Sequence, residues 1–200
     1  MSVDVMLSQE EISFRKEFKD FLEGLDLSFI LRMDKEDEKE FPKDFVRLLG
    51  QNNYLGIPLP KMVGGRGLNT VCAILAEEEL GGLAFPLGCA MGMSTYLCRA
   101  IYKYGKEDLW KRYVIPTMKA ELICAEGITE PLKGSDIARL KTTAKKQGDH
   151  YIIAGEKRFQ KGGVGADWFL TFARTNPNVA PHKGITAFVV ERKHGVQVVE

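Results

Sequence analysis

The residues best suited to chemistry lie between Glu126 and Gly163, in the stretch EGITEPLKGSDIARLKTTAKKQGDHYIIAGEKRFQKGG. Thr-Glu-Pro at 129–131 is followed after two residues by Gly-Ser-Asp at 134–136. Glycine allows another molecule to approach the backbone closely, and serine adds a small hydrogen-bond donor. Such a turn can hold the phosphates of a ligand. It can equally be an ordinary type I or II turn with a capping serine.

The segments around this stretch have the pattern of strands. From Leu122 onward, β-branched and aromatic residues form short runs separated by Gly and Asp, which is typical of strands. Gln147-Gly148-Asp149 predicts a hairpin turn, because glycine adopts positive φ with little strain. The predicted strands are 122–129, 139–146, 150–154, 156–161, 167–174, 184–191 and 195–199.

The first 120 residues have the pattern of helices. Ser8-Gln9-Glu10-Glu11 matches the S-x-x-E capping box, and Phe14, Phe18 and Phe21 follow at the spacing of one apolar helical face. The charged run DKEDEKE at 34–40 predicts a solvated loop or a helix end. Further helices are predicted from Phe41-Pro42, over 69–80, 87–104 and 106–118, with an irregular connector at Pro58, Pro60 and 64–67 and an interruption near Pro116.

These patterns predict an α+β fold with two domains. We expect an α-helical N-terminal domain over residues 1–120 and an antiparallel β domain over residues 121–200. The sequence stops at Glu200, directly after the strand-like GVQVVE. We therefore expect the β domain to be incomplete at its C-terminal end, and the chain to be part of something larger.

Composition and charge exclude several classes of function. The net charge is +1 and the basic residues are spread along the chain, so we expect no nucleic-acid binding and no attraction to a membrane surface. The uncharged stretch Leu80–Cys98 contains Gly81, Gly82 and Pro86, which should divide it into a turn and a shorter buried helix. The sequence contains no P-loop, dinucleotide fingerprint or G-x-S-x-G elbow.

The cysteines do not indicate a metal site. Cysteines 72, 89, 98 and 124 form no C-x-x-C pair, and histidines 150, 182 and 194 lie far along the chain. Buried, reduced thiols are the simpler interpretation, and they indicate a reducing compartment. The N-terminus lacks the basic and apolar regions of a signal peptide. Together these features predict a cytoplasmic protein.

Several segments, in the same order, resemble the acyl-CoA dehydrogenase family, and the likeness covers nearly the whole chain. The segments are FPKDFVRLLGQNNYLGIPLPKMVGGRG (41–67), YGKEDLWKRYVIPTMKAELICAEGITEP (104–131), KTTAKKQGDHYIIAGEKRFQKGGVGADWFLTFART (141–175) and KGITAFVVERKHGVQV (183–198). Gly-Ser-Asp alone would be a weak signal, but the ordered set is a strong one.

The resemblance implies a fold and a reaction. Family members have a helical N-terminal domain, a middle β domain and a C-terminal four-helix bundle, and the sequence here accounts for the first two. The reaction is FAD-dependent α,β-dehydrogenation of an acyl-CoA thioester, an oxidoreductase step of fatty acid metabolism. The catalytic carboxylate in most members comes from the bundle, so it is expected beyond residue 200. Electrons leave to an electron-transfer flavoprotein, and we expect a homo-oligomer or a second chain that supplies the bundle.

The resemblance also assigns site residues. Ile128 and Thr129 match the strand along the pyrimidine edge of the flavin, where a backbone N–H and a hydroxyl can donate. Gly134 and Ser135 match the turn near the flavin pyrophosphate and the acyl-CoA. Phe159-Gln160-Lys161 matches a second flavin-facing strand, in which alternation would put Phe159 and Lys161 on one face.

Some of these residues depart from the family pattern. Lys161 stands where members have Thr or Ser, and a cation there would raise the flavin potential unless the side chain extends into solvent. Glu126 replaces an uncharged residue near the acyl chain. It could select a polar acyl group, pair with Lys161, act as a replacement base, or be an exposed residue on an edge strand. His182 lies in a loop that runs near the CoA phosphates in the family, or in an ordinary surface loop.

Two other functions remain open at this point. Acyl-CoA oxidases and flavin monooxygenases share the fold. Alternatively, the chain could be a family-like subunit that binds a partner and does no chemistry, since Glu126 and Lys161 depart from the pattern and the bundle is missing.

Overall fold

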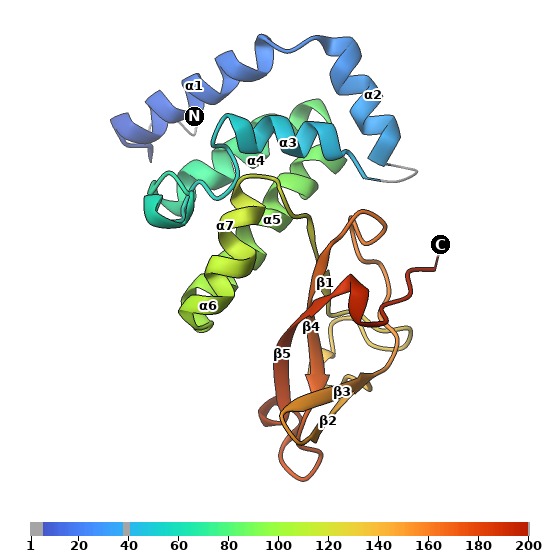
Figure 1. Ribbon diagram of the computed structural model, residues 1–200. Coiled ribbons are helices and arrows are strands. Elements are labelled where there is room, and N and C mark those ends of the chain that lie inside the picture. Colours follow the sequence, from blue (N-terminus) through green and yellow to red (C-terminus); the bar gives the residue numbers. More distant parts are fainter. Residues whose placement is uncertain (1–5, 38–40, 200) are drawn as a thin grey trace. The chain divides into compact units, whose positions relative to one another are not determined.

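The structure is a computed structural model that describes residues 6–37 and 41–199 (Figure 1). The chain divides into two compact units, Met1–Ile123 and Cys124–Glu200. The first unit is helical and the second contains the sheet, so the predicted α+β fold class is confirmed.

The helical unit begins with the predicted capping box. Ser8 Oγ accepts a hydrogen bond from the Glu11 backbone N–H, and the Glu11 carboxylate accepts one from the Ser8 N–H. Helix α1 (Gln9–Glu23) then buries Phe14 and Phe18 along one face. The remaining helices are α2 (Leu27–Asp37), α3 (Lys43–Gln51), α4 (Thr70–Leu83), α5 (Phe85–Tyr104), α6 (Glu107–Leu109) and α7 (Ile115–Met118), with a 3-10 turn, η2 (Lys61–Val63), and a π-helical turn, η3 (Trp110–Val114).

The sequence did not predict helix α2. Its first turn is stabilised by Asp26, whose carboxylate accepts hydrogen bonds from the Ser28 N–H and hydroxyl. The charged run predicted as a loop or helix end forms the end of α2 up to Asp37. Residues 38–40 of that run lie outside the described residues.

The expected division of Leu80–Cys98 is found, but at Ala84 between α4 and α5; its predicted position at Gly81-Gly82 is wrong, because α4 continues through both glycines to Leu83. The reason is packing against α5: a Cβ added at Gly88 would lie 3.3 Å from Gly81 Cα, so the two helices approach backbone to backbone. No helix among the described residues has both the length and the apolar character needed to cross a membrane.

The connector between α3 and α4 is held by an arginine. Arg66 donates through Nη1 and Nη2 to the two carboxylate oxygens of Glu17, at 2.7 and 2.8 Å. Its guanidinium lies over the rings of Phe14 and Tyr54, 5.1 and 5.4 Å from their centres. The GGRG connector is therefore fixed to α1 by charge and by stacking.

The β unit contains one mixed sheet (Figure 1). The sheet has antiparallel pairs β2–β3 and β4–β5, and β4 also pairs in parallel with β1 and, through Thr143 and Arg174, with β2. The domain is therefore not purely antiparallel. The strands are β1 (Cys124–Gly127), β2 (Thr143–Gln147), β3 (His150–Ala154), β4 (Trp168–Arg174) and β5 (Ile185–Glu191).

Five of the seven predicted strands are found, and the predicted hairpin turn joins β2 to β3. Its first loop residue, Gly148, has φ +59°, as a type II′ turn requires. The strands predicted over 156–161 and 195–199 are wrong. Residues 155–160 form an irregular loop, and residues 196–199 pair with no strand of the described part after the left-handed Gly195.

Candidate functional site

The segment that follows β1 is bound along its length by the irregular loop 155–160. Lys157 Nζ donates to the Ile128 carbonyl oxygen at 3.1 Å, and the Arg158 backbone N–H donates to the Thr129 carbonyl oxygen at 2.8 Å. These bonds bring together two of the segments that the sequence singled out, 128–129 and 159–161. Ile128 and Thr129 are both half-buried.

Thr129 keeps its own donors available. Among the described residues, none accepts a hydrogen bond from the Thr129 N–H or from its hydroxyl. A half-buried residue with two unused donors is suited to binding a ligand that offers acceptors, since buried polar groups normally find partners. This segment can therefore hold the edge of a ring that carries carbonyl oxygens and ring nitrogens.

Glu130 follows Thr129 in the chain and is a buried carboxylate, with only 4% of its surface exposed. It accepts hydrogen bonds from the Lys141 N–H, from the N–H and hydroxyl of Thr142 at 2.8 and 2.6 Å, and from Lys157 Nζ at 3.0 Å. Burial alone would raise its pKa, but these hydrogen bonds outweigh burial and lower the pKa to about 2. Burial also lowers the pKa of Lys157, and the Glu130 carboxylate opposes that shift.

Phe159 is placed by an unusual backbone conformation. Its φ is +59°, in the left-handed region that favours glycine, and 87% of its surface is exposed. A left-handed backbone at a residue other than glycine is strained, and an exposed aromatic ring is unfavourable in water. Both features are frequent at ligand-binding sites. Residues 159–161 do not form a strand, so strand alternation does not apply to them. The prediction that Phe159 and Lys161 share one face of a strand is therefore wrong.

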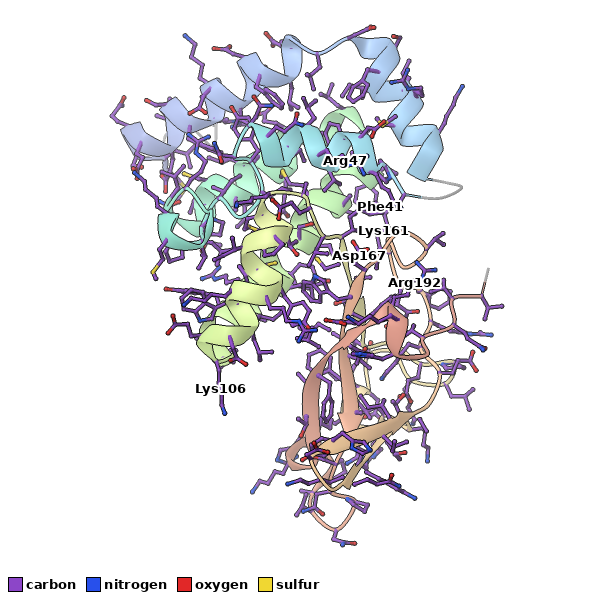
Figure 2. The ribbon with its side chains drawn as sticks, in the orientation of Figure 1. Phe41, Arg47, Lys106, Lys161, Asp167 and Arg192 are labelled. Carbon is purple, nitrogen blue, oxygen red and sulfur yellow. The ribbon has the colours of Figure 1, made fainter. Side chains whose placement is uncertain are left out.

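Gln160 and Lys161 lead into a tight turn over residues 161–165. Gln160 Nε2 donates to the Arg158 carbonyl oxygen at 2.6 Å, and the Gly163 N–H donates to the Gln160 carbonyl oxygen at 3.0 Å. Arg192 donates from the other side to the carbonyl oxygens of Val164 and Ala166. Figure 2 shows Lys161, Asp167 and Arg192 at the same end of the β unit, where β4 begins. Lys161 is half-buried there.

The Gly-Ser-Asp turn lies in a second cluster. Gly134 and Ser135 are exposed, and a Cβ added at Gly134 would meet no atom within 4 Å, so the backbone is open to close approach. Within the described part of the chain Ser135 caps no helix: the short 3-10 turn η4 (Ile137–Arg139) follows Asp136 without a side-chain cap. The alternative of a merely capping serine therefore has no support here.

Arg174 joins this turn to the loop that carries His182. Its Nη2 donates to the Ala138 carbonyl oxygen at 2.6 Å, and its Nη1 donates to the Pro181 carbonyl oxygen at 3.2 Å. His182 is exposed in the 3-10 turn η5 (Pro181–Lys183), beside η4. The structure thus brings the turn that carries His182 beside η4, which begins two residues after Ser135.

Glu126 lies on β1, opposite Leu170 of β4, and is half-buried. Among the described strands β1 pairs with β4 alone, so it is an edge strand. The predicted alternative of an exposed residue on an edge strand is therefore met for the strand but not for the exposure of Glu126. Glu130 and Lys157 were not predicted as site residues. Glu130 belongs to the Thr-Glu-Pro motif and Lys157 to the family-like segment 141–175, but a separation of 27 residues in the sequence concealed their pairing.

Comparison with known proteins gives the family. The description "Acyl-CoA dehydrogenase, N-terminal domain" matches residues 8–121, and "Acyl-CoA dehydrogenase, middle domain" matches residues 125–200. The chain belongs to the acyl-CoA dehydrogenase family. The resemblance drawn from the sequence is therefore confirmed.

Individual relatives agree with this assignment. The short-chain specific acyl-CoA dehydrogenase of Clostridium acetobutylicum is 35% identical over 191 residues, which cover 95% of this chain and 50% of the relative. The crystal structure of an acyl-CoA dehydrogenase from Geobacillus kaustophilus superposes with a TM-score of 0.83 at 32% identity, covering 93% of this chain and 49% of that one. A glutaryl-coenzyme A dehydrogenase in complex with glutaryl-CoA gives a TM-score of 0.84 at 31% identity, covering 94% and 48%. The chain therefore spans about half the length of the relatives it matches.

Proposed function

We propose that this chain binds FAD and an acyl-CoA thioester as part of an acyl-CoA dehydrogenase, and that the proton-abstracting carboxylate is supplied from outside residues 1–200. The observation that carries the proposal is the ledge formed by residues 128–130 and 157–160. There, two unused donors of Thr129 lie beside the loop that bears the exposed, left-handed Phe159.

The residues of the ledge fit a flavin. The N–H and hydroxyl of Thr129 would donate to oxygen and nitrogen atoms on the pyrimidine edge of the ring, with Ile128 beside them. The aromatic surface of Phe159 would cover part of the ring, and Gln160 and Lys161 would border it. Gly134 and Ser135 would hold the pyrophosphate, since the backbone there is open. When bound, FAD would accept the hydride that leaves the β-carbon of the acyl chain.

The acyl-CoA would be held by the second cluster. Ser135 is placed to bind both ligands, and His182, next to Lys183 on η5, would face the CoA phosphates. Glu126 would act at the acyl chain, as a selector of polar acyl groups. None of these residues is assigned as the catalytic base. The base would be a carboxylate from outside residues 1–200, and that part of the enzyme would orient it toward the α-proton of the substrate.

The proposal extends to partners and location. We include an electron-transfer flavoprotein as electron acceptor, and a homo-oligomer or a second chain that completes the fold. The buried cysteines at 72, 98 and 124 form no disulfide bond, which suits a reducing compartment, so we propose that the protein is cytoplasmic.

Flavin titration tests the proposal. The chain, purified with any polypeptide that remains bound to it, is titrated with FAD while flavin absorbance and fluorescence are recorded. We expect saturable uptake, weakened by Thr129→Val, which removes one donor, and unaffected by Thr143→Val, a matched change on β2. A colourless protein without uptake would instead support a non-catalytic partner. Rapid reoxidation of the reduced flavin by air would support an oxidase or monooxygenase.

A further inference from the structure

We propose that Lys157 tunes the bound flavin through a peptide group: its ammonium polarises the Ile128 carbonyl, and this strengthens the Thr129 N–H as a donor to the flavin. This inference rests on the proposed function. Lys157 is a positioning residue in this scheme, since it acts on the flavin through Thr129 and does not itself touch the reacting atoms.

The Lys157 ammonium lies at the carbonyl end of the peptide group that joins Ile128 to Thr129. The N–H at the other end of this peptide group would face the ligand. Lys157 Nζ lies 3.1 Å from the Ile128 carbonyl oxygen, and only 11% of the lysine side chain is exposed. In so dry a site a charge-assisted hydrogen bond is stronger than it would be in water.

The carbonyl of Ile128 and the N–H of Thr129 belong to one planar, conjugated peptide unit. A donor at the oxygen increases the C–N double-bond character and leaves the N–H more positive, as in chains of hydrogen bonds that polarise one another. No described residue accepts from the Thr129 N–H, so this added donor strength is available to a ligand. The Arg158 N–H bond to the Thr129 carbonyl oxygen holds the unit in place.

The Glu130 carboxylate holds the Lys157 ammonium in position, but the position of Glu130 does not depend on Lys157. The carboxylate also receives hydrogen bonds from Lys141 and Thr142, so its place in the fold survives the loss of Lys157. Because Glu130 and Lys157 form a neutral pair, their combined long-range field at the ligand is small. The local bond to the Ile128 carbonyl oxygen is therefore the means by which Lys157 acts.

The test compares Lys157→Met with the double variant Lys157→Met/Glu130→Gln, which removes both buried charges and so leaves no unpaired carboxylate. Lys157→Arg keeps a cation, and Lys146→Met removes an exposed lysine of β2 as a matched control. Two quantities are measured: the amide resonance of Thr129 by NMR in the flavin-free chain, and the affinities for oxidised and reduced FAD in the chain with any bound partner.

We expect the Thr129 amide resonance to move upfield in Lys157→Met and in the double variant, and to stay near its wild-type position in Lys157→Arg and Lys146→Met. Affinity for reduced FAD should fall about fivefold more than affinity for oxidised FAD, which lowers the two-electron potential by about 20 mV. A purely structural role would weaken both redox states equally and leave the potential unchanged.

The outcomes separate this inference from the function on which it rests. If the wild-type chain takes up no FAD, the proposed function fails and the inference falls with it. If all variants bind FAD at one unchanged potential, or if the Thr129 resonance does not respond to the loss of Lys157, only the inference is overturned. If Lys157→Met does not fold, the double variant decides the question.

Discussion

Arg158 donates its backbone N–H to the carbonyl oxygen of Thr129 at 2.8 Å, and this bond replaces the strand pairing that the sequence predicts for residues 156–161. The bond fixes the chain one residue before Phe159, whose backbone is left-handed. The residue before this exposed aromatic side chain is thus bonded to the Thr129 carbonyl oxygen, through a backbone contact that no side-chain pattern reveals.

The conformation of Phe159 gives the first prediction. Phe159→Gly relieves a left-handed backbone that is unfavourable by about 1–2 kcal/mol, partly offset by the greater freedom of glycine in the unfolded chain. We expect the flavin-free protein to keep its stability or gain up to about 1 kcal/mol in urea unfolding. Affinity for FAD should fall in fluorescence titration, because the ring that would cover the flavin is lost.

Leu132→Gly is the control for this prediction. Leu132 is 89% exposed, but its φ is not positive, so its loss relieves no strain. We expect slightly lower stability from the added glycine and unchanged FAD affinity. Equal loss of FAD affinity in both variants would show that Phe159 has no specific part in binding.

The buried pair of Glu130 and Lys157 gives the second prediction. Glu130→Ala leaves the Lys157 ammonium buried without its partner, and loss of one member of a buried pair lowers stability by about 3–5 kcal/mol. The double variant Lys157→Met/Glu130→Gln should be much less destabilised, because no charge is then left unpaired. Urea unfolding followed by the fluorescence of Trp168, which is fully buried in the β unit, measures both. A loss of stability in the double variant equal to the sum of the losses in Glu130→Gln and Lys157→Met would contradict the pairing.

The pKa of Glu130 gives the third prediction, for acid conditions. Its pKa is about 2 in the folded protein, against an ordinary value of 4.5. A carboxyl group with a lowered folded pKa stabilises the fold above its unfolded pKa, and this contribution is lost as the pH falls through the folded pKa. We expect the free energy of unfolding to decline from about pH 4.5 toward pH 2, with a shallower decline in Glu130→Gln.

The matched control for the acid limb is Glu121→Gln, which changes an exposed carboxyl group. It should leave the slope of stability against pH as it is in the wild type. The pKa of Glu17 is also lowered, chiefly by its hydrogen bonds from Arg66, so part of the acid slope should persist in Glu130→Gln.

Local patterns predicted most of the fold, because capping residues and hydrophobic spacing act within a few residues. The capping box of α1 and the hairpin turn at Gly148 were both predicted from neighbouring residues in this way, and both are found. The errors arose where distant contacts override local preference. Gly81 remains helical because α4 packs closely against α5 there, and the loop around Arg158 is irregular because the Arg158 N–H donates to the Thr129 carbonyl oxygen.

The same distinction holds for the candidate site. Thr129, Gly134 and Ser135 could be selected from a motif, and their roles at a flavin stay predictions. Glu130 and Lys157 could not be paired from the sequence, since their contact joins positions 27 residues apart through a fold that the strand pattern did not describe. Arg174, which joins η4 to η5, was missed for the same reason.

Three glycines of the helical unit give the last prediction, because the fold requires a glycine at these positions to different degrees. A Cβ on Gly65 would lie 2.1 Å from the Leu59 carbonyl oxygen, so Gly65→Ala must displace backbone and should lower stability by about 3 kcal/mol or more. Gly67 has φ +71° with no atom closer than 4.0 Å to an added Cβ, so Gly67→Ala should lose only about 1 kcal/mol from strain. Gly82 is helical with open space around it, and Gly82→Ala should increase the free energy of unfolding by about 0.5–1 kcal/mol.

Urea unfolding of the three variants should therefore give the highest stability for Gly82→Ala, above wild type, followed below wild type by Gly67→Ala and then Gly65→Ala. A Gly65→Ala variant as stable as Gly67→Ala would mean that the connector can move away from Leu59, and that the Arg66 contacts with Glu17 do not hold it rigidly.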